Sequence, residues 1–220
     1  MFAQAGETPQ TAPTATYTDS DGNEQTVSAG YSVTEDAPLT VSFTANATNT
    51  DDYVTNYKWQ VYEESDTTPY IVRYEEDMTL TFTSAGTHNI ILTATFTSTD
   101  GTSFSIESEA ISIAISESKL EFPNAFSPNG DGINDIYKAK DGYQSIVEFE
   151  ATIYNRWGQK IYSWNDPSGG WDGTFNGKPV KQGVYFVNVK AKGADGRNYH
   201  IRRDVNLLRG YTESSTSSDE

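Results

Sequence analysis

The chain has 220 residues, no cysteine and a formal net charge of −16. The lack of cysteine excludes disulfides, thiolate metal sites and a cysteine nucleophile. Aromatic residues make up 13% of the sequence, too many for general disorder, and no apolar run approaches the roughly 20 residues of a membrane-spanning helix. The acidic balance disfavours nucleic-acid binding, which needs a concentrated basic surface. The length suits two domains of ordinary size.

The net charge lies entirely in the first half. Residues 1–118 contain 18 Asp and Glu against only Lys58 and Arg73, whereas residues 119–220 contain 13 charged residues of each sign. Threonine is also concentrated before residue 119. A change in charge that coincides with a change in composition predicts a domain boundary near residue 118. The acidic half is most simply explained as a solubilising surface.

The N-terminal half has the pattern of an antiparallel β-sandwich. Residues 1–14 are rich in Thr, Pro, Ala and Gln and predict a flexible lead-in. Within residues 15–118, apolar and polar residues alternate in short segments, and turn signals such as Asp100-Gly101 separate them. These segments cover residues 41–45, 57–61, 80–82, 92–96 and 111–115. We expect two packed sheets with Trp59 in the core.

Two segments of this half resemble a known family. Tyr57-Lys58-Trp59, followed by residues 81–88 and 92–95, is similar in order and type to the PKD-type immunoglobulin-like domain. The chain departs from that family directly after Trp59, where Gln60-Val61-Tyr62 replaces the usual Asp-Phe-Gly-Asp-Gly turn. The resemblance implies an immunoglobulin-like fold.

The C-terminal half repeats the β pattern with different turns. Alternation marks strands at 147–153, 160–164, 184–189 and 199–205, with turns at 155–159 and 194–197. This pattern predicts a second β-sandwich over residues 119–210, followed by a disordered tail at 211–220. The expected fold class is therefore all-β, with two tandem immunoglobulin-like β-sandwich domains.

Four ordered motifs in residues 120–209 carry a more specific resemblance. They are the run from Phe122 to Asp135, then Asn155-Arg156-Trp157-Gly158, Gly170-Trp171-Asp172-Gly173 and Gly183-Val184-Tyr185. Together they resemble the gliding-motility-associated C-terminal domain of secreted Bacteroidetes proteins. The resemblance implies a β-sandwich that serves as the signal for type IX secretion and as a surface-attachment module. In this chain, residues 210–220 continue beyond the point where such domains usually stop.

The loop at 129–135 has the spacing of a calcium site. Asn129, Asp131 and Asp135 offer side-chain oxygens, and Ile133 can offer its carbonyl. Calcium takes six to eight oxygens, whereas a short loop of this type can offer only four or five before water completes the shell. Binding would therefore be weak, with a Kd on the order of 10⁻⁴–10⁻³ M. The alternative is an Asx-turn loop in which the same side chains cap their own backbone. No other cofactor is expected.

Three tryptophans lie close together in the sequence. Trp157, Trp164 and Trp171 could form an aromatic platform for sugar rings. The alternative is structural: Trp171 would pack on the core, Asp172 would cap the turn, and Gly173 would take a positive φ.

The sequence favours no enzyme. It has only His88 and His200, no His-Glu-x-x-His pair and no Gly-x-Ser-x-Gly turn. The expected function is that of a non-catalytic extracellular or outer-membrane surface protein with a spacer or adhesin-like first domain and an export module behind it. Its partners would be the secretion machinery or other surface proteins, without nucleic acid or a transmembrane segment. A carbohydrate-binding module is the alternative. Residues 1–5 have no signal-peptide pattern, so no leader is expected in this chain.

Overall fold

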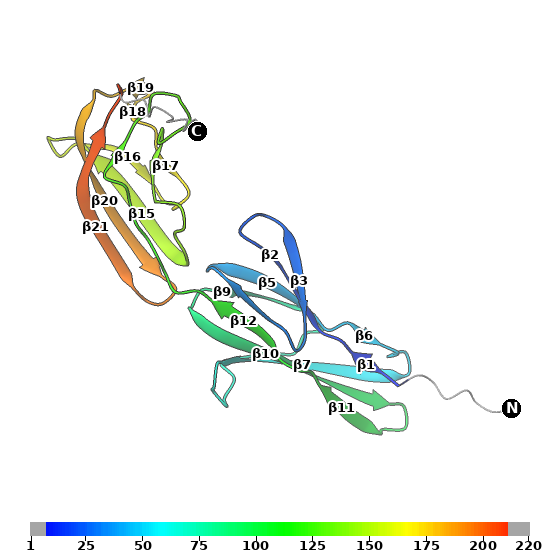
Figure 1. The fold of residues 1–220 in the computed structure, drawn as a ribbon. Helices are drawn as coiled ribbons and strands as arrows, with labels where there is room; N and C mark the ends of the chain where they lie inside the picture. Colours follow the sequence, from blue (N-terminus) through cyan, green and yellow to red (C-terminus); the bar gives the residue numbers. More distant parts are fainter. Residues whose placement is uncertain (1–7, 211–220) are drawn as a thin grey trace, which may run out of the picture. The chain divides into compact units, whose positions relative to one another are not determined.

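The computed structural model describes residues 8–210, which divide into two compact units between Glu117 and Ser118. In the described part of the chain every regular element is a strand (Figure 1). Within residues 8–210 there is no helix that is long and apolar enough to cross a membrane. The unit boundary falls one residue before the change in charge and composition.

The first unit is a sandwich of two sheets. The four-stranded sheet has the order β3-β2-β5-β9, and the six-stranded sheet has the order β4-β12-β10-β7-β8, with β11 also paired to β10. Only the β4–β12 pair is parallel. The strands of the two sheets are β2 (Thr14–Thr18), β3 (Glu24–Ser28), β4 (Ser32–Glu35), β5 (Leu39–Thr44), β7 (Tyr53–Glu63), β8 (Ile71–Arg73), β9 (Met78–Phe82), β10 (Gly86–Ser98), β11 (Ser103–Glu107) and β12 (Ile111–Ile115).

Alternation along these strands places the apolar residues between the two sheets. Trp59 on β7 is fully buried, as predicted, and its ring centroid lies 5.9 Å from that of Phe43 on β5. The indole Nε1 donates a 3.1 Å hydrogen bond to the carbonyl of Glu76. Trp59 therefore joins the two sheets as a structural residue.

The expected lead-in at 1–14 is wrong for its last residues. β1 (Gln10–Thr11) pairs with β6 (Ala47–Thr48), and β2 begins at Thr14. Pro9 and Pro13 are buried, as are Ala15 and Tyr17 of β2. The alternation of buried and exposed residues in β2 therefore extends towards the N-terminus. Proline within a segment normally argues against a strand, so the sequence pattern did not indicate one here. Both prolines are tolerated because the strand does not need their missing N–H groups. Residues 1–7 lie outside the described part.

The threonine excess is explained by the outward faces of this unit. Hydroxyl groups pair across neighbouring strands, for example Thr40 with Thr81 at 2.9 Å and Thr95 with Ser105 at 2.8 Å. Threonine is a good strand former and such cross-strand pairs add to sheet stability. The threonines need no functional explanation.

The second unit is built on one five-stranded sheet with the order β13-β21-β20-β15-β16. Two short ladders, β14–β17 and β18–β19, accompany it. The β13–β21 pair is parallel and the others are antiparallel. The strands are β13 (Ala125–Phe126), β14 (Tyr137–Lys138), β15 (Ile146–Tyr154), β16 (Lys160–Trp164), β17 (Gly170–Trp171), β18 (Thr174–Phe175), β19 (Lys178–Pro179), β20 (Gly183–Gly193) and β21 (Asn198–Leu207).

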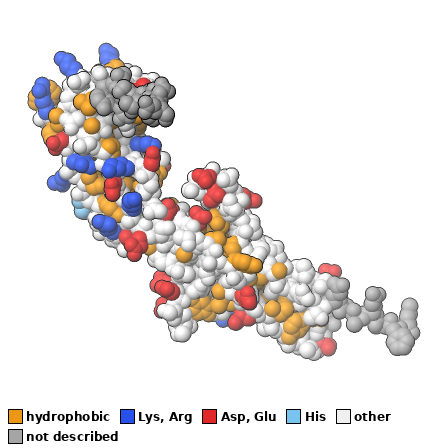
Figure 2. All heavy atoms as spheres, in the orientation of Figure 1, with side chains coloured by type: hydrophobic (Ala, Val, Ile, Leu, Met, Phe, Trp, Pro, Cys, Tyr) orange, Lys and Arg blue, Asp and Glu red, His pale blue; other side chains and the backbone are white. Residues whose placement is uncertain are grey.

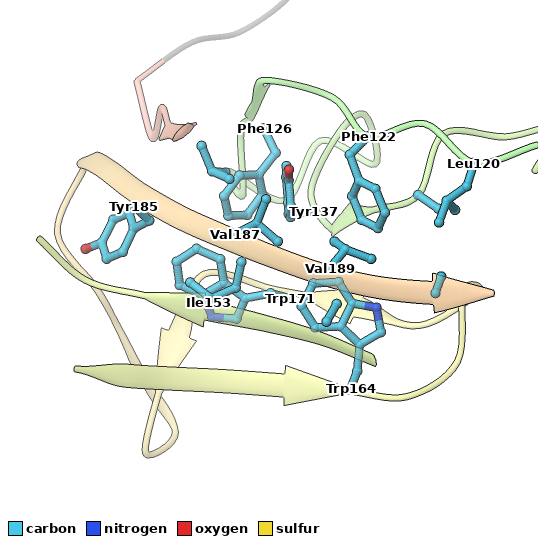
Figure 3. Close-up of a cluster of buried hydrophobic side chains, with 14 of the residues drawn as sticks. Leu120, Phe122, Phe126, Tyr137, Ile153, Trp164, Trp171, Tyr185, Val187 and Val189 are labelled. Atoms are coloured by element: carbon cyan, nitrogen blue, oxygen red, sulfur yellow. The ribbon is translucent and has the colours of Figure 1, made fainter. Parts of the chain in front are cut away.

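The core of the second unit lies on one face of this sheet. Val187 and Val189 of β20 point into it, together with Ile153 of β15 (Figure 3). Leu120 and Phe122 enter the same core from the segment that precedes β13. The opposite face of the sheet carries mostly polar and charged side chains, as the alternation predicts, together with the exposed Val184 and Phe186 of β20.

The first residue of the second unit is fixed to its β20–β21 hairpin. The Ser118 hydroxyl donates a 2.7 Å hydrogen bond to Asp195, and the Tyr199 hydroxyl donates to the Ser118 carbonyl at 2.9 Å. The hydrogen bond from Ser118 holds the pKa of Asp195 below its usual range. The tail at 211–220 lies outside the described residues.

Candidate functional site

The loop from Ser127 to Asp135 is closed by one carboxylate. Asp135 Oδ1 accepts hydrogen bonds from the backbone N–H groups of Asn129 (2.9 Å) and Gly130 (2.8 Å), and Oδ2 accepts one from Gly132 (2.8 Å). The two glycines have φ values of 83° and 85°, which bend the backbone around the carboxylate. The N–H donors of Gly130 and Gly132 lower the pKa of Asp135.

The other predicted calcium residues lie in the same loop and are also hydrogen-bonded within it. Asn129 Oδ1 accepts from the Asp131 N–H at 3.0 Å, and Asp131 Oδ1 accepts from the Ile133 N–H at 2.8 Å. Within residues 8–210, no group of three or more His, Asp or Glu side chains could hold a metal ion. The arrangement is that of successive Asx turns, which is the alternative to a calcium site, and these contacts do not test calcium binding.

The Trp-Asp-Gly turn has the geometry that its sequence predicts. Asp172 Oδ1 accepts hydrogen bonds from the backbone N–H and the hydroxyl of Thr174, at 2.9 and 2.7 Å. Gly173 has a φ of 76°. A Cβ at Gly170 would lie 2.7 Å from the Tyr137 carbonyl, so the β14–β17 pair requires a glycine there. Both positions of this motif therefore require glycine, Gly170 for lack of space and Gly173 for its positive φ.

Three of the four motifs meet in the core through their aromatic residues. The ring centroid of Trp171 lies 5.3 Å from that of Phe126 and 5.1 Å from that of Tyr185. Phe126 belongs to the first motif, Trp171 to the third and Tyr185 to the fourth. These motif residues therefore build one structure, and their aromatic rings are buried.

Arg209 joins the same motifs at the end of the last strand. Its guanidinium donates hydrogen bonds to the carbonyls of Gly173 (2.7 Å), Pro128 (3.1 Å) and Val180 (3.0 Å). Sequence reasoning missed this residue, because three contacts with segments 29 to 81 residues away leave no local pattern. Its position directly before the predicted tail was the available signal.

The predicted tryptophan platform is corrected by the structure. Trp171 is fully buried and its Nε1 donates to the Thr174 carbonyl, while Trp164 is 8% exposed in the same core. Both indoles fill space beneath the sheet and offer no face to a ligand, so glycan contact through Trp164 or Trp171 is wrong. Only Trp157, which is 75% exposed, is placed for such a contact.

Trp157 is held on a rigid turn between β15 and β16. Asn155 Oδ1 accepts the backbone N–H groups of Trp157 and Gln159, both at 3.0 Å, and Gly158 has a φ of 78°. The Arg156 guanidinium lies 4.4 Å from the centre of the indole ring, within the range of a cation–π contact. The second motif therefore presents a fixed pair, Arg156 and Trp157, to the outside.

The two histidines lie in different units. His88 is 3% exposed, and because a carbonyl only accepts, its Nε2 donates to the Ser84 carbonyl at 3.0 Å. In the neutral ring Nδ1 then accepts from the Tyr70 hydroxyl at 2.9 Å. Burial, with a contribution from Glu63, raises the pKa of Tyr70 to about 12. His88 is thus a hydrogen-bonded core residue.

The fold places the chain in the class of tandem all-β proteins, with an immunoglobulin-like sandwich first. Residues 120–201 match the family model described as the CHU_C Type IX secretion signal domain. The second unit is therefore a type IX secretion signal domain, as the four motifs predicted. This signal implies export to the cell surface or the extracellular space and interaction with the secretion machinery.

Solved structures of several multidomain β proteins are similar to this chain only at a low level. The fibronectin(III)-like modules of Clostridium thermocellum CbhA share 16% identity, with a TM-score of 0.24 over 82% of this chain and 90% of theirs. The chicken CNTN1 FN1–FN3 domains share 9%, with a TM-score of 0.32 over 88% and 74%. Bacteroides ovatus SGBP-B, in complex with a mixed-linkage heptasaccharide, shares 15%, with a TM-score of 0.26 over 81% and 43%.

No curated protein matches the chain.

Proposed function

We propose that this protein is a non-catalytic surface or secreted protein whose second unit directs export and surface attachment. The observation that carries the proposal is the match of residues 120–201 to a type IX secretion signal domain, which lies wholly within one compact unit. Phe126, Trp171 and Tyr185 make that unit a single folded module.

The first unit is proposed as a spacer or adhesin-like module. Its core is closed between two sheets, and the acidic residues of its half outnumber Lys58 and Arg73 by 16. Figure 2 shows acidic side chains on the first unit and basic side chains gathered on the second. A strongly charged, hydroxyl-rich surface keeps a module soluble and resists non-specific association.

Deletion tests the export role. The complete chain, a variant without residues 118–220 and a variant without residues 8–117 would be expressed behind the same leader in a host with type IX secretion. We expect the complete chain and the variant that retains the second unit to reach the surface or the medium. The variant without residues 118–220 should accumulate inside the cell. Normal export of that variant would contradict the proposal.

Carbohydrate binding is a second candidate function. It is favoured by Trp157, a large aromatic residue that is 75% exposed on a turn fixed by Asn155. A glycan array would compare the unchanged chain with Trp157→Ala and with Tyr162→Ala, a less exposed aromatic residue on β16. We expect binding that only Trp157→Ala removes. An array without any binding would exclude this candidate and leave the export role untouched.

A further inference from the structure

Two grooves flank the turn that carries Arg156 and Trp157. One, of about 460 Å³, has an apolar lining that includes Ile161, Phe175 and Val184. The other, of about 590 Å³, lies against β15, β20 and β21 and includes Asn188 and Arg202 in its lining. Asn155, Arg156 and Phe186 line both grooves. The grooves are therefore adjacent, and Arg156 stands between them.

Positive charge is concentrated around these two grooves. The cationic side chains of their linings are those of Arg156, Lys181 and Arg202, against the single acidic residue Asp204. Arg203 also borders the larger groove, but its guanidinium donates to the Phe122 carbonyl on the core side of β21. The three salt bridges of residues 8–210 involve other side chains, namely Lys138 with Asp141, Lys140 with Glu121 and Lys192 with Glu148. The cations of the grooves thus carry a net positive charge that no ion pair in the described part neutralises, in a chain of net charge −16.

The aromatic part of this surface is exposed and held in place. Trp157 is 75% exposed and Phe186, on the outward face of β20, is 42% exposed. One face of the Trp157 indole lies against the Arg156 guanidinium, which leaves the other face for a ligand. Because the Asn155 hydrogen bonds already fix the turn, a ligand would lose little conformational freedom of the protein on binding.

We infer that the two grooves bind an anionic polysaccharide, and this inference deepens and rests on the second candidate function. Guanidinium groups bind carboxylate and sulfate through paired hydrogen bonds, which suits Arg156 and Arg202 to the acidic groups of such a chain. The apolar face of a sugar ring packs on the free face of Trp157.

The sheet topology argues against an acidic peptide as the ligand. Peptides that dock on β proteins commonly add a strand to a free sheet edge. Under the larger groove, β15 and β20 are each paired on both sides in the order β21-β20-β15-β16. Recognition over β15 and β20 must proceed through side chains, which is the mode that a sugar chain uses. The outer edge of β21 pairs with β13 only at Asn206 and Leu207, so the polyglutamate probe below tests a peptide at that edge.

The experiment titrates the complete chain with four probes in a calorimeter. The probes are a sulfated heparin-derived decasaccharide, an oligogalacturonate, a neutral maltodextrin of similar length and polyglutamate. We expect binding of at least one acidic glycan, weakened about tenfold or more when the salt is raised from 20 to 300 mM, because salt screens exposed charges. Arg156→Ala with Arg202→Ala, and separately Trp157→Ala, should each weaken binding at least tenfold.

Arg197→Ala is the matched control, because Arg197 also lies over an aromatic ring, 5.0 Å from the centre of Tyr199, but lines neither groove. It should bind as the unchanged chain does, and melting temperatures should confirm that all variants fold. Binding of maltodextrin through Trp157 with no preference for the acidic glycans would overturn the inference while the carbohydrate-binding candidate stands. Equal binding of polyglutamate would also overturn the inference, because it would show that the grooves attract any polyanion through charge alone. The absence of any glycan binding would overturn both.

Discussion

Arg209 Nη2 donates a 2.7 Å hydrogen bond to the carbonyl of Gly173, which joins the end of the last strand to the Trp-Asp-Gly turn. A Cβ at Gly173 would lie 3.1 Å from the same Nη2 atom and 3.0 Å from Pro128. The glycine is therefore needed both for its positive φ and for the approach of the guanidinium.

Replacement of Arg209 by alanine should destabilise the second unit by about 2–3 kcal/mol, because three carbonyls lose a charged donor. Arg209→Lys should recover only part of this loss, since one ammonium group cannot reproduce the planar guanidinium. Urea unfolding of both variants measures the effect, with Arg197→Ala as the exposed control. A loss of less than about 0.5 kcal/mol for Arg209→Ala would show that the three hydrogen bonds do not hold the unit together.

The tryptophans of the second unit should separate into core and surface residues. Trp171→Ala should cost about 3–5 kcal/mol because it leaves a cavity next to Phe126 and Tyr185. Trp157→Ala should change the free energy of unfolding by less than about 0.5 kcal/mol, because the side chain is exposed. Denaturant unfolding followed by tyrosine fluorescence tests both. Similar losses for the two variants would contradict the core assignment.

The loop at Asp135 should lose stability in acid. The pKa of the Asp135 carboxyl is lowered in the folded state, so the unfolded state binds the proton more readily. The contribution of Asp135 is therefore complete above its unfolded pKa of about 3.9 and is lost as the pH falls through the lower folded value. Asp135→Asn should melt at a lower temperature than the unchanged chain at pH 7, and the difference should shrink towards pH 2. A constant difference over this range would contradict the prediction.

Calcium should have little effect on the same loop. Asn129, Asp131 and Asp135 already accept backbone hydrogen bonds from within the loop, so the turn forms without an ion. We expect the same melting temperature in 2 mM calcium and in chelator, and no heat on titration. A clear rise in melting temperature with calcium that Asp131→Asn removes would instead assign a weak cation site to Asn129, Asp131, Ile133 and Asp135.

Patterns that are local in sequence predicted the fold well. Period-two alternation identified both β units and the core position of Trp59, and turn chemistry identified the turn at Asp172–Gly173, because each depends on neighbouring residues. The sequence left open whether Trp164 and Trp171 face the core or a ligand. Each ends a strand, and a strand pattern alone does not show which of its two faces is covered. The contacts of Arg209 and the grooves beside Arg156 bring together distant segments, and no local pattern encodes them.

The most direct test of the export role is transfer to an unrelated protein. A folded reporter behind a leader would be fused to residues 118–220 and expressed in a type IX-competent host and in the same host without that machinery. Surface or medium reporter would be measured against a fusion carrying Trp171→Ala, which removes the core contact between the motifs. We predict export of the unchanged fusion only, and only in the competent host. Retention of that fusion inside the competent host, or export of the reporter without residues 118–220, would contradict the account.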